Sequence, residues 1–336
     1  MNGVDTLMAT CPLKHEIRVS FWEPYIKKLG LKTVSYLTLY SPPLMDVKYL
    51  HYKGLIETDD VSYKDVVGVG FNTDSEADTT ANLDKRLGLL LSGDINTLIY
   101  DGGRKSLKVK QLEEKFPFDV INLDYTDTLH NYSREEELSP HIKAIDTILS
   151  RQQKGNKDEF ILFVTTNANL TDYNPEFIEH LKGLVTKNIN ETPGFSDKLQ
   201  KVTDCVNTDD YFHTFQQDCF AVSLVKYLLS FLSDHNYTIE DGDIKWLMRD
   251  EGKYVTNMLH LGFHIKRFIP PPVKAKATVG KRKNDVEFKS VEFIKKKYHI
   301  LKESVDKQRL WDKHSAQING FNNLTFELNV PEPKDE

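Results

Sequence analysis

Short apolar runs that alternate with helical patterns constrain this chain of 336 residues more than any other feature. Such runs lie at 31–40, 66–71, 89–94, 118–124 and 159–167. Strands that are apolar along their whole length are buried on both faces, as in a parallel sheet that helices cover on both sides. The sequence therefore predicts an α/β protein with a doubly wound, mainly parallel sheet.

The later part of the chain departs from this alternation in two places. Residues 170–215 are polar and helix-prone, and they predict a helical insertion after the fifth strand. Two further apolar runs, 244–249 and 254–268, flank a charged turn and predict a C-terminal antiparallel hairpin. We expect three parts: an N-terminal helical cap (1–30), the sheet domain with its insertion (31–268), and a basic linker, amphipathic helix and tail (269–336).

Composition limits where such a protein acts. The chain has no apolar run of about 18 residues, so no membrane-spanning helix is expected. Its three cysteines are far apart and include no C-x-x-C pair, which is typical of a reducing compartment. We expect a cytoplasmic protein that binds neither a membrane nor a metal ion.

Positive charge is concentrated near the C-terminus. Residues 266–313 contain 15 Lys or Arg and 6 Asp or Glu, although the whole chain has a net charge of −6. A basic segment on an acidic body predicts an anionic partner, and nucleic acid is the first candidate. The alternative is a solvated lysine-rich segment that binds nothing. The predicted phosphate contacts are Lys274, Lys276, Lys281, Arg282 and Lys283.

A helix is predicted over 291–305. Its apolar residues recur at spacings of three and four, which gives one apolar stripe. The stripe is predicted to dock on the protein's own body, or alternatively on a protein partner. The residues of the stripe are Val291, Ile294, Tyr298, Leu301 and Val305.

The fourth apolar run ends in an acid and an aromatic residue, Asp124 and Tyr125. Ligands of doubly wound sheets bind outside the carboxyl ends of the strands, so this carboxylate lies where chemistry is expected. A structural alternative is that Asp124 caps the following turn while Tyr125 packs on the sheet. His260 and His264 share one face of a predicted strand, and their ordinary explanation is a pair of half-buried histidines.

The order of elements resembles the class I S-adenosylmethionine-dependent methyltransferase superfamily over residues 31–268. Leu91-Ser92-Gly93-Asp94 is similar to the family's Gly-Asp after strand three, and 118–124 is similar to its fourth-strand motif. The resemblance implies a Rossmann-like methyltransferase fold and amino-group methylation of a base. It implies the catalytic residues Asn122, Asp124 and Tyr125. It also implies S-adenosylmethionine contacts from Tyr40, Ser41, Asp46, Asn72, Asp74, Gly93 and Asp94.

One motif of the family is missing from the chain. The loop after the first strand is usually rich in glycine, because only glycine lets the backbone approach the cofactor closely. Here the loop contains Pro42 and Pro43, which remove two backbone donors, and it has no glycine. We therefore expect weak binding of S-adenosylmethionine or none. Two hypotheses follow: a methyltransferase that acts on or beside nucleic acid, and an inactive interaction subunit of a bacterial DNA-modification or defence assembly.

Overall fold

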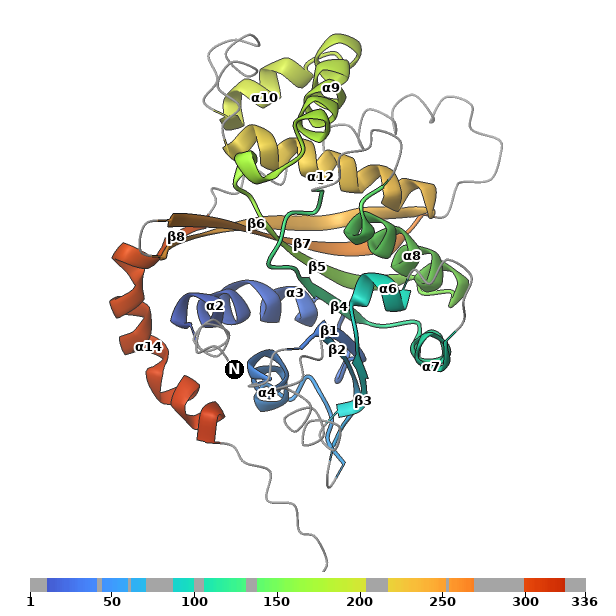
Figure 1. The fold of residues 1–336 in the computed structure, drawn as a ribbon, viewed down its shortest axis with the longest axis vertical. Coiled ribbons are helices and arrows are strands. Elements are labelled where there is room, and N and C mark those ends of the chain that lie inside the picture. The colour runs from blue at the N-terminus through green and yellow to red at the C-terminus, as the bar shows by residue number, and fades with distance from the viewer. Residues whose placement is uncertain are drawn as a thin grey trace, which may run out of the picture.

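The structure is a computed structural model that describes residues 11–40, 44–59, 62–70, 87–99, 106–130, 138–203, 217–251, 254–268 and 299–323. The described strands form one sheet with the order β3-β2-β1-β4-β5-β7-β6-β8 (Figure 1). The strands are β1 (Tyr36–Leu39), β2 (Tyr63–Gly70), β3 (Leu87–Ser92), β4 (Val120–Asp124), β5 (Glu159–Asn167), β6 (Tyr237–Glu251), β7 (Tyr254–Arg267) and β8 (His299–Lys302).

The pairing of the strands confirms the predicted architecture. Strands β3, β2, β1, β4 and β5 are parallel neighbours, and β7 pairs antiparallel with both β5 and β6. The long hairpin of β6 and β7 thus extends the sheet beyond β5. A mainly parallel sheet with this one reversed strand is the Rossmann-like methyltransferase fold that the sequence predicted.

Helices cover both faces of the sheet (Figure 1). One face packs against α6, α8 and α12, and the other against α2, the π-helical turn η1, α3, α4 and α14. Among the described helices, none combines the length and apolar character that crossing a bilayer requires. The helical elements are α2 (Pro12–Ile17), η1 (Arg18–Trp22), α3 (Glu23–Lys27), α4 (Met45–Tyr52), α6 (Ile95–Ile99), α7 (Leu107–Lys115), α8 (Pro140–Lys154), η2 (Leu170–Asp172), α9 (Pro175–Glu191), α10 (Phe195–Thr203), α12 (Gln217–Asp234) and α14 (Glu303–Asn323).

Strand alternation divides the core into two clusters. Leu37 and Ile121 point toward the α8 side, whereas Tyr36 and Val120 point toward the α2 side. Helix α8 starts at Pro140, where the sequence favours the start of a helix. The Ser139 hydroxyl caps the helix by accepting a hydrogen bond from the Ile142 N–H, and Pro140 occupies the first turn. The sheet therefore separates two apolar core layers, one on each of its faces.

The prediction of a helix over 291–305 is wrong over residues 299–302. Residues His299–Lys302 form β8, which pairs in parallel with β6, and Leu301 is buried there. As a strand, this segment pairs its backbone N–H and C=O groups with those at the edge of β6. The next helix, α14, begins only at Glu303. Residues 291–298 lie outside the described residues.

Two other boundaries also differ from those predicted. The first strand begins at Tyr36 instead of residue 31, and β6 starts at Tyr237, before the predicted 244.

Close packing of the N-terminal helices on the sheet depends on Gly262 in β7. A Cβ atom at this position would lie 2.5 Å from Cζ of Phe21, a residue of η1 that is buried on the same face. The missing side chain therefore creates the space that the Phe21 ring fills.

We predict that Gly262→Ala lowers the free energy of unfolding by about 1–3 kcal/mol, because the buried ring must move. Urea denaturation measures this change. Gly183→Ala in α9 is the matched control, since no atom lies within 4 Å of its added Cβ. That variant should gain up to about 1 kcal/mol from helix propensity. Equal effects of the two substitutions would contradict the packing role of Gly262.

Candidate functional site

The candidate site lies where β4, β5 and β7 meet beneath α2. Asp124, the last residue of β4, stands directly opposite Thr165 of β5, and Thr165 stands opposite His260 of β7. Directly paired residues share one face of a sheet, so these three side chains form a polar row. Lys245 of β6 continues the row, opposite His260.

The carboxylate of Asp124 is held by a cation from the N-terminal helix. Lys14 Nζ in α2 donates a hydrogen bond to Asp124 Oδ2 at 2.8 Å, and the two side chains are only 15% and 19% exposed. Burial by itself would raise the pKa of Asp124, but the charge and hydrogen bond of Lys14, together with His260 and Arg18, outweigh burial and hold this pKa below its usual range. Asp124 is therefore a partly buried, ionised carboxylate that already binds an amine.

Asn122 lies near Asp124 on the same face of the sheet and belongs to a second group of hydrogen-bonded polar side chains. Its Nδ2 donates to Thr38 Oγ1 at 3.4 Å, and Thr38 donates to Asp46 Oδ2 at 2.8 Å. The hydroxyl of Tyr36 donates to the same oxygen of Asp46 at 2.9 Å. Asp46, for which a cofactor contact was predicted, thus joins α4 to β1 through its Oδ2 atom.

Tyr125 is separated from Asp124, because it packs in the opposite apolar cluster. Its hydroxyl donates to Asn96 Oδ1 at 3.4 Å, and its ring meets the His141 ring edge-on with centroids 4.3 Å apart. The structure therefore brings Asn122 and Asp124 together on one face and leaves Tyr125 apart from them.

Gly93 and Asp94 form the turn between β3 and α6. Gly93 has φ +146°, a conformation that only glycine adopts easily, and its N–H donates to Gly70 O at 2.7 Å. Asp94 Oδ1 accepts a hydrogen bond from the Asn96 N–H at 3.1 Å, and Oδ2 accepts one from Thr97 at 3.3 Å. Asp94 thus stabilises the start of α6, while a carboxylate retains capacity for further hydrogen bonds.

The residue that precedes α4 is not a glycine, although its backbone conformation favours one. Leu44 takes the left-handed conformation with φ 48°, which is unfavourable for a leucine, and its side chain is fully buried. Tyr40 follows β1 and packs its ring on Gly70, since a Cβ on Gly70 would lie 2.4 Å from that ring. The other predicted contacts lie outside the described residues: Ser41, Asn72, Asp74, Lys274, Lys276, Lys281, Arg282 and Lys283.

These residues can be tested against S-adenosylmethionine, the cofactor that the fold implies. Among the described residues, Oδ1 of Asn122 and Oδ1 of Asp124 are buried and have no hydrogen-bond partner. Buried oxygens of this kind require donors, so the end of β4 fits a ligand that carries N–H or O–H groups. Gly93 and Asp94 fit close approach of such a ligand at β3. The start of α4 fits less well, because the Leu44 side chain fills the core there.

Sequence reasoning missed Lys14 and Thr165, and it explained His260 as an ordinary strand histidine. The sequence could have indicated a role for His260 in part, because the hairpin was predicted and its two histidines, His260 and His264, share one face of the strand. No local pattern marks Lys14, because the contact joins residues 110 positions apart.

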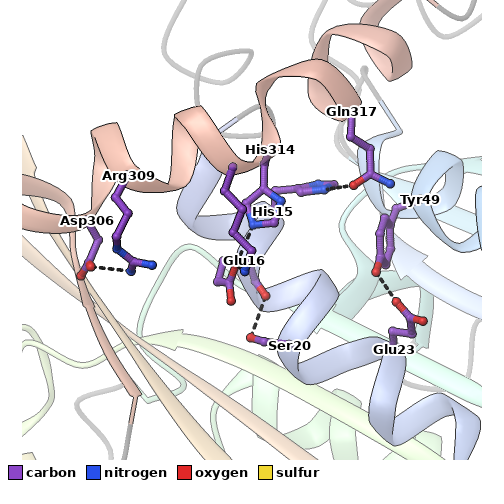
Figure 2. A network of polar contacts seen from close by, with 10 residues as sticks. His15, Glu16, Ser20, Glu23, Tyr49, Asp306, Arg309, His314 and Gln317 are labelled. Carbon is purple, nitrogen blue, oxygen red and sulfur yellow. Dashed lines mark hydrogen bonds and ion pairs between the residues drawn. The ribbon is translucent and has the colours of Figure 1, made fainter.

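A clasp between the two ends of the chain holds α2 in place, and Figure 2 shows its side chains. His15 Nε2 of α2 lies 2.9 Å from Gln317 Oε1 of α14. Glu16 of α2 accepts hydrogen bonds from Lys313 at 2.8 Å and from His314 at 2.6 Å. These contacts lie beside Lys14 in the sequence, so the clasp fixes the helix that carries the cation of the site.

Two groups in the clasp have pKa values that favour docking at neutral pH. Burial, together with the charge of the neighbouring Arg18, lowers the pKa of His15 from 6.5 to about 4. Burial would raise the pKa of Glu16, but hydrogen bonds from Lys313 and His314 hold it below its usual range. The unfolded chain therefore binds more protons than the folded chain in mild acid.

We predict that acidification loosens α14 from α2. The His15 shift corresponds to about 3 kcal/mol, which is lost progressively as the pH falls from 6.5 to about 4. Hydrogen exchange in 306–319, corrected for its intrinsic pH dependence, should become faster relative to α8 between about pH 7 and about pH 5. The variant His15→Gln should show a weaker pH dependence, and an unchanged one would contradict the role of His15.

We predict that Lys14→Met raises the pKa of Asp124 and lowers the free energy of unfolding by about 1–3 kcal/mol, because a partly buried carboxylate loses its cation. The loss should be complete at neutral pH and should shrink as the pH falls through the carboxyl range near 3.8. Carbon NMR of the carboxyl group and urea denaturation measure the two effects.

Lys27→Met is the matched control for this measurement. It removes an ion pair with Glu23 in which the lysine side chain is 56% exposed, so its cost should stay below about 1 kcal/mol. Equal costs for the two variants would mean that the Lys14–Asp124 pair is an ordinary surface contact.

Comparisons with solved structures return several methyltransferases at very low identity. TYW2 from M. jannaschii, solved with AdoMet, has 8% identity and a TM-score of 0.34, with 72% of this chain and 74% of that chain covered. The plantazolicin methyltransferase BamL, solved with SAH, has 8% identity and a TM-score of 0.35, with 74% and 85% covered. At such TM-scores these likenesses carry no weight, and the assignment of the fold depends on the strand order described above.

Comparison with curated protein sequences gives no match. A family model described as PP_RS20740-like matches residues 11–319, which include every strand and helix of the structure except the last residues of α14. The chain therefore belongs to the PP_RS20740-like family.

Proposed function

We propose that the protein transfers a methyl group from S-adenosylmethionine to an amino group on or beside nucleic acid, and that Asp124 binds the accepting amine. The observation that carries the proposal is the contact between Asp124 Oδ2 and an amine, Lys14 Nζ, at the carboxyl end of β4. This end of a doubly wound sheet is where ligands bind. A carboxylate that binds one amine there can bind another through its second oxygen.

Positioning is the main task of the protein in such a transfer. S-adenosylmethionine, when bound, supplies an electrophilic methyl group, and Gly93 and Asp94 at the end of β3 are the described residues best placed to contact it. Asp124 accepts a hydrogen bond from the amine and so orients the nitrogen lone pair. Asn122 lies on the same face and offers a further acceptor. Tyr125 receives no role in this proposal, because it packs on the opposite face.

Contact with nucleic acid is proposed from charge alone. Basic segments bind phosphate backbones with little sequence preference, and their affinity falls steeply with salt. The residues proposed for this contact are Lys274, Lys276, Lys281, Arg282 and Lys283.

A second candidate function is an interaction subunit that keeps the fold and transfers nothing. The observations that favour it lie at the start of α4. Leu44 fills the turn where the family places glycine, and Asp46 Oδ2 is engaged by Tyr36 and Thr38. Such a subunit would serve a bacterial DNA-modification or defence assembly as a docking component.

Calorimetric titration with S-adenosylmethionine and S-adenosylhomocysteine tests the proposal. We predict weak but saturable binding that Asp94→Ala weakens by about 5-fold to 10-fold, the effect of about one lost hydrogen bond. Asp124→Asn should abolish methyl transfer and spare cofactor affinity.

Ser106→Ala is the matched control for Asp94→Ala. Ser106 caps α7 by accepting a hydrogen bond from the Val109 N–H, so its loss removes the cap of a helix that carries none of the residues proposed for the site. It should lower stability and leave cofactor affinity unchanged. Absence of any binding by the wild type would overturn the transferase proposal and favour the interaction subunit.

A further inference from the structure

His260 occupies a position in the site that its ordinary explanation does not account for. It is 2% exposed and stands two strands away from Asp124, with Thr165 between them in the same row. Neighbouring strands lie about 4.8 Å apart, so the Cα atoms of Asp124 and His260 are about 10 Å apart. Both side chains extend from the same face of the sheet, on either side of Thr165.

Each of the two side chains has one atom with a partner and one without. Nδ1 of His260 lies 2.8 Å from Thr165 Oγ1, and Asp124 Oδ2 accepts from Lys14. Among the described residues, Nε2 of His260 and Oδ1 of Asp124 are buried and have no hydrogen-bond partner. Two buried polar atoms without partners, at the ends of one row, are costly unless a ligand or water satisfies both.

We propose that His260 Nε2 and Asp124 Oδ1 each accept one N–H of the accepting amine. This inference deepens the proposed function and rests on it for the identity of the ligand. A primary aromatic amine has two N–H groups in the plane of its ring. When both are bound by acceptors, the nitrogen is fixed and its lone pair can turn toward an incoming methyl group.

The surroundings of His260 keep its imidazole neutral, as an acceptor must be. Burial, helped by the charges of Lys14 and Arg18 and opposed by Asp124, lowers the pKa of His260 to about 4. The hydrogen bond to Thr165 can then hold the proton on Nδ1, which leaves the Nε2 lone pair free to accept. Lys245, opposite His260, forms its own ion pair with Asp243 at 3.0 Å.

Two acceptors side by side define the class of substrate. They favour an exocyclic –NH₂ group, as in adenine or cytosine, because both of its N–H groups are bound. They disfavour a ring carbonyl at the same place, as in hypoxanthine or uracil, because a carbonyl oxygen would face two acceptors. They also disfavour a monomethylated amine, which has lost one N–H. The site should therefore add a single methyl group.

Nitrogen NMR of the histidine side chains tests this proposal without any methyl transfer. We expect His260 in the Nδ1–H tautomer. Its Nε2 signal should shift during titration with adenosine or cytidine, and much less with inosine, uridine or N6-methyladenosine. The affinities for adenosine and inosine, and those for cytidine and uridine, should differ on the order of 10-fold, as for a paired hydrogen-bond contact to a base edge.

His264 is the internal control on the same strand and the same face. Its Nε2 already pairs with Glu159, so its signal should not respond to any nucleoside. In Asp124→Asn the preference for adenosine over inosine should disappear. An Nε2–H tautomer, equal responses to adenosine and inosine, or no response at His260 would each overturn the proposal.

This test separates the present inference from the proposed function. If calorimetry detects no S-adenosylmethionine binding and His260 still selects adenosine over inosine, the site binds amines and the transferase proposal fails. If the cofactor binds and the Nε2 signal of His260 does not shift with any nucleoside, the protein can still be a transferase, but the role proposed for His260 is wrong.

Discussion

A carboxylate in an apolar interior must be neutralised, and the arrangement around Asp124 follows from this requirement. The cation that meets it, Lys14, comes from α2, so the N-terminal helix has to lie over the carboxyl end of β4. Gly262 permits this by giving Phe21 room to settle on the sheet. The clasp of His15 and Glu16 with α14 then holds the helix in its place. Neutralisation of Asp124 thus depends on how both α2 and α14 pack.

The sheet was predictable because its strands are continuous apolar runs, and β5 was predicted with its exact bounds, Glu159–Asn167. The hairpin was predictable because a charged turn separates two apolar segments. The segment 299–302 was not predictable, since its apolar spacing fits a helix. Only the unpaired edge of β6, a tertiary feature, makes it a strand. Local sequence patterns thus identify buried strands, but they fail for a segment that becomes a strand only by pairing with a distant strand.

The candidate site was predictable only as far as strand ends could be located. Asn122 and Asp124 follow from the position of β4 in the sheet. The separation of Tyr125 from Asp124 follows from strand alternation, because adjacent residues point to opposite faces. Lys14 could not be predicted, since no periodicity links α2 to β4. Long-range polar pairs carry no local sequence signal, and they form the larger part of this site.

The clasp between α2 and α14 joins residues that are 302 and 298 positions apart in the chain. A ribosome releases α2 long before α14, because most of the described strands and helices lie between them in the sequence. Contacts with so large a separation form late, because the intervening chain must first be ordered. Until then, Lys14 lacks the support that fixes it over Asp124. A nascent chain that has not yet reached α14 can therefore assemble most of its sheet and still lack the contacts that hold α2, so the site is completed only after α14 has been made.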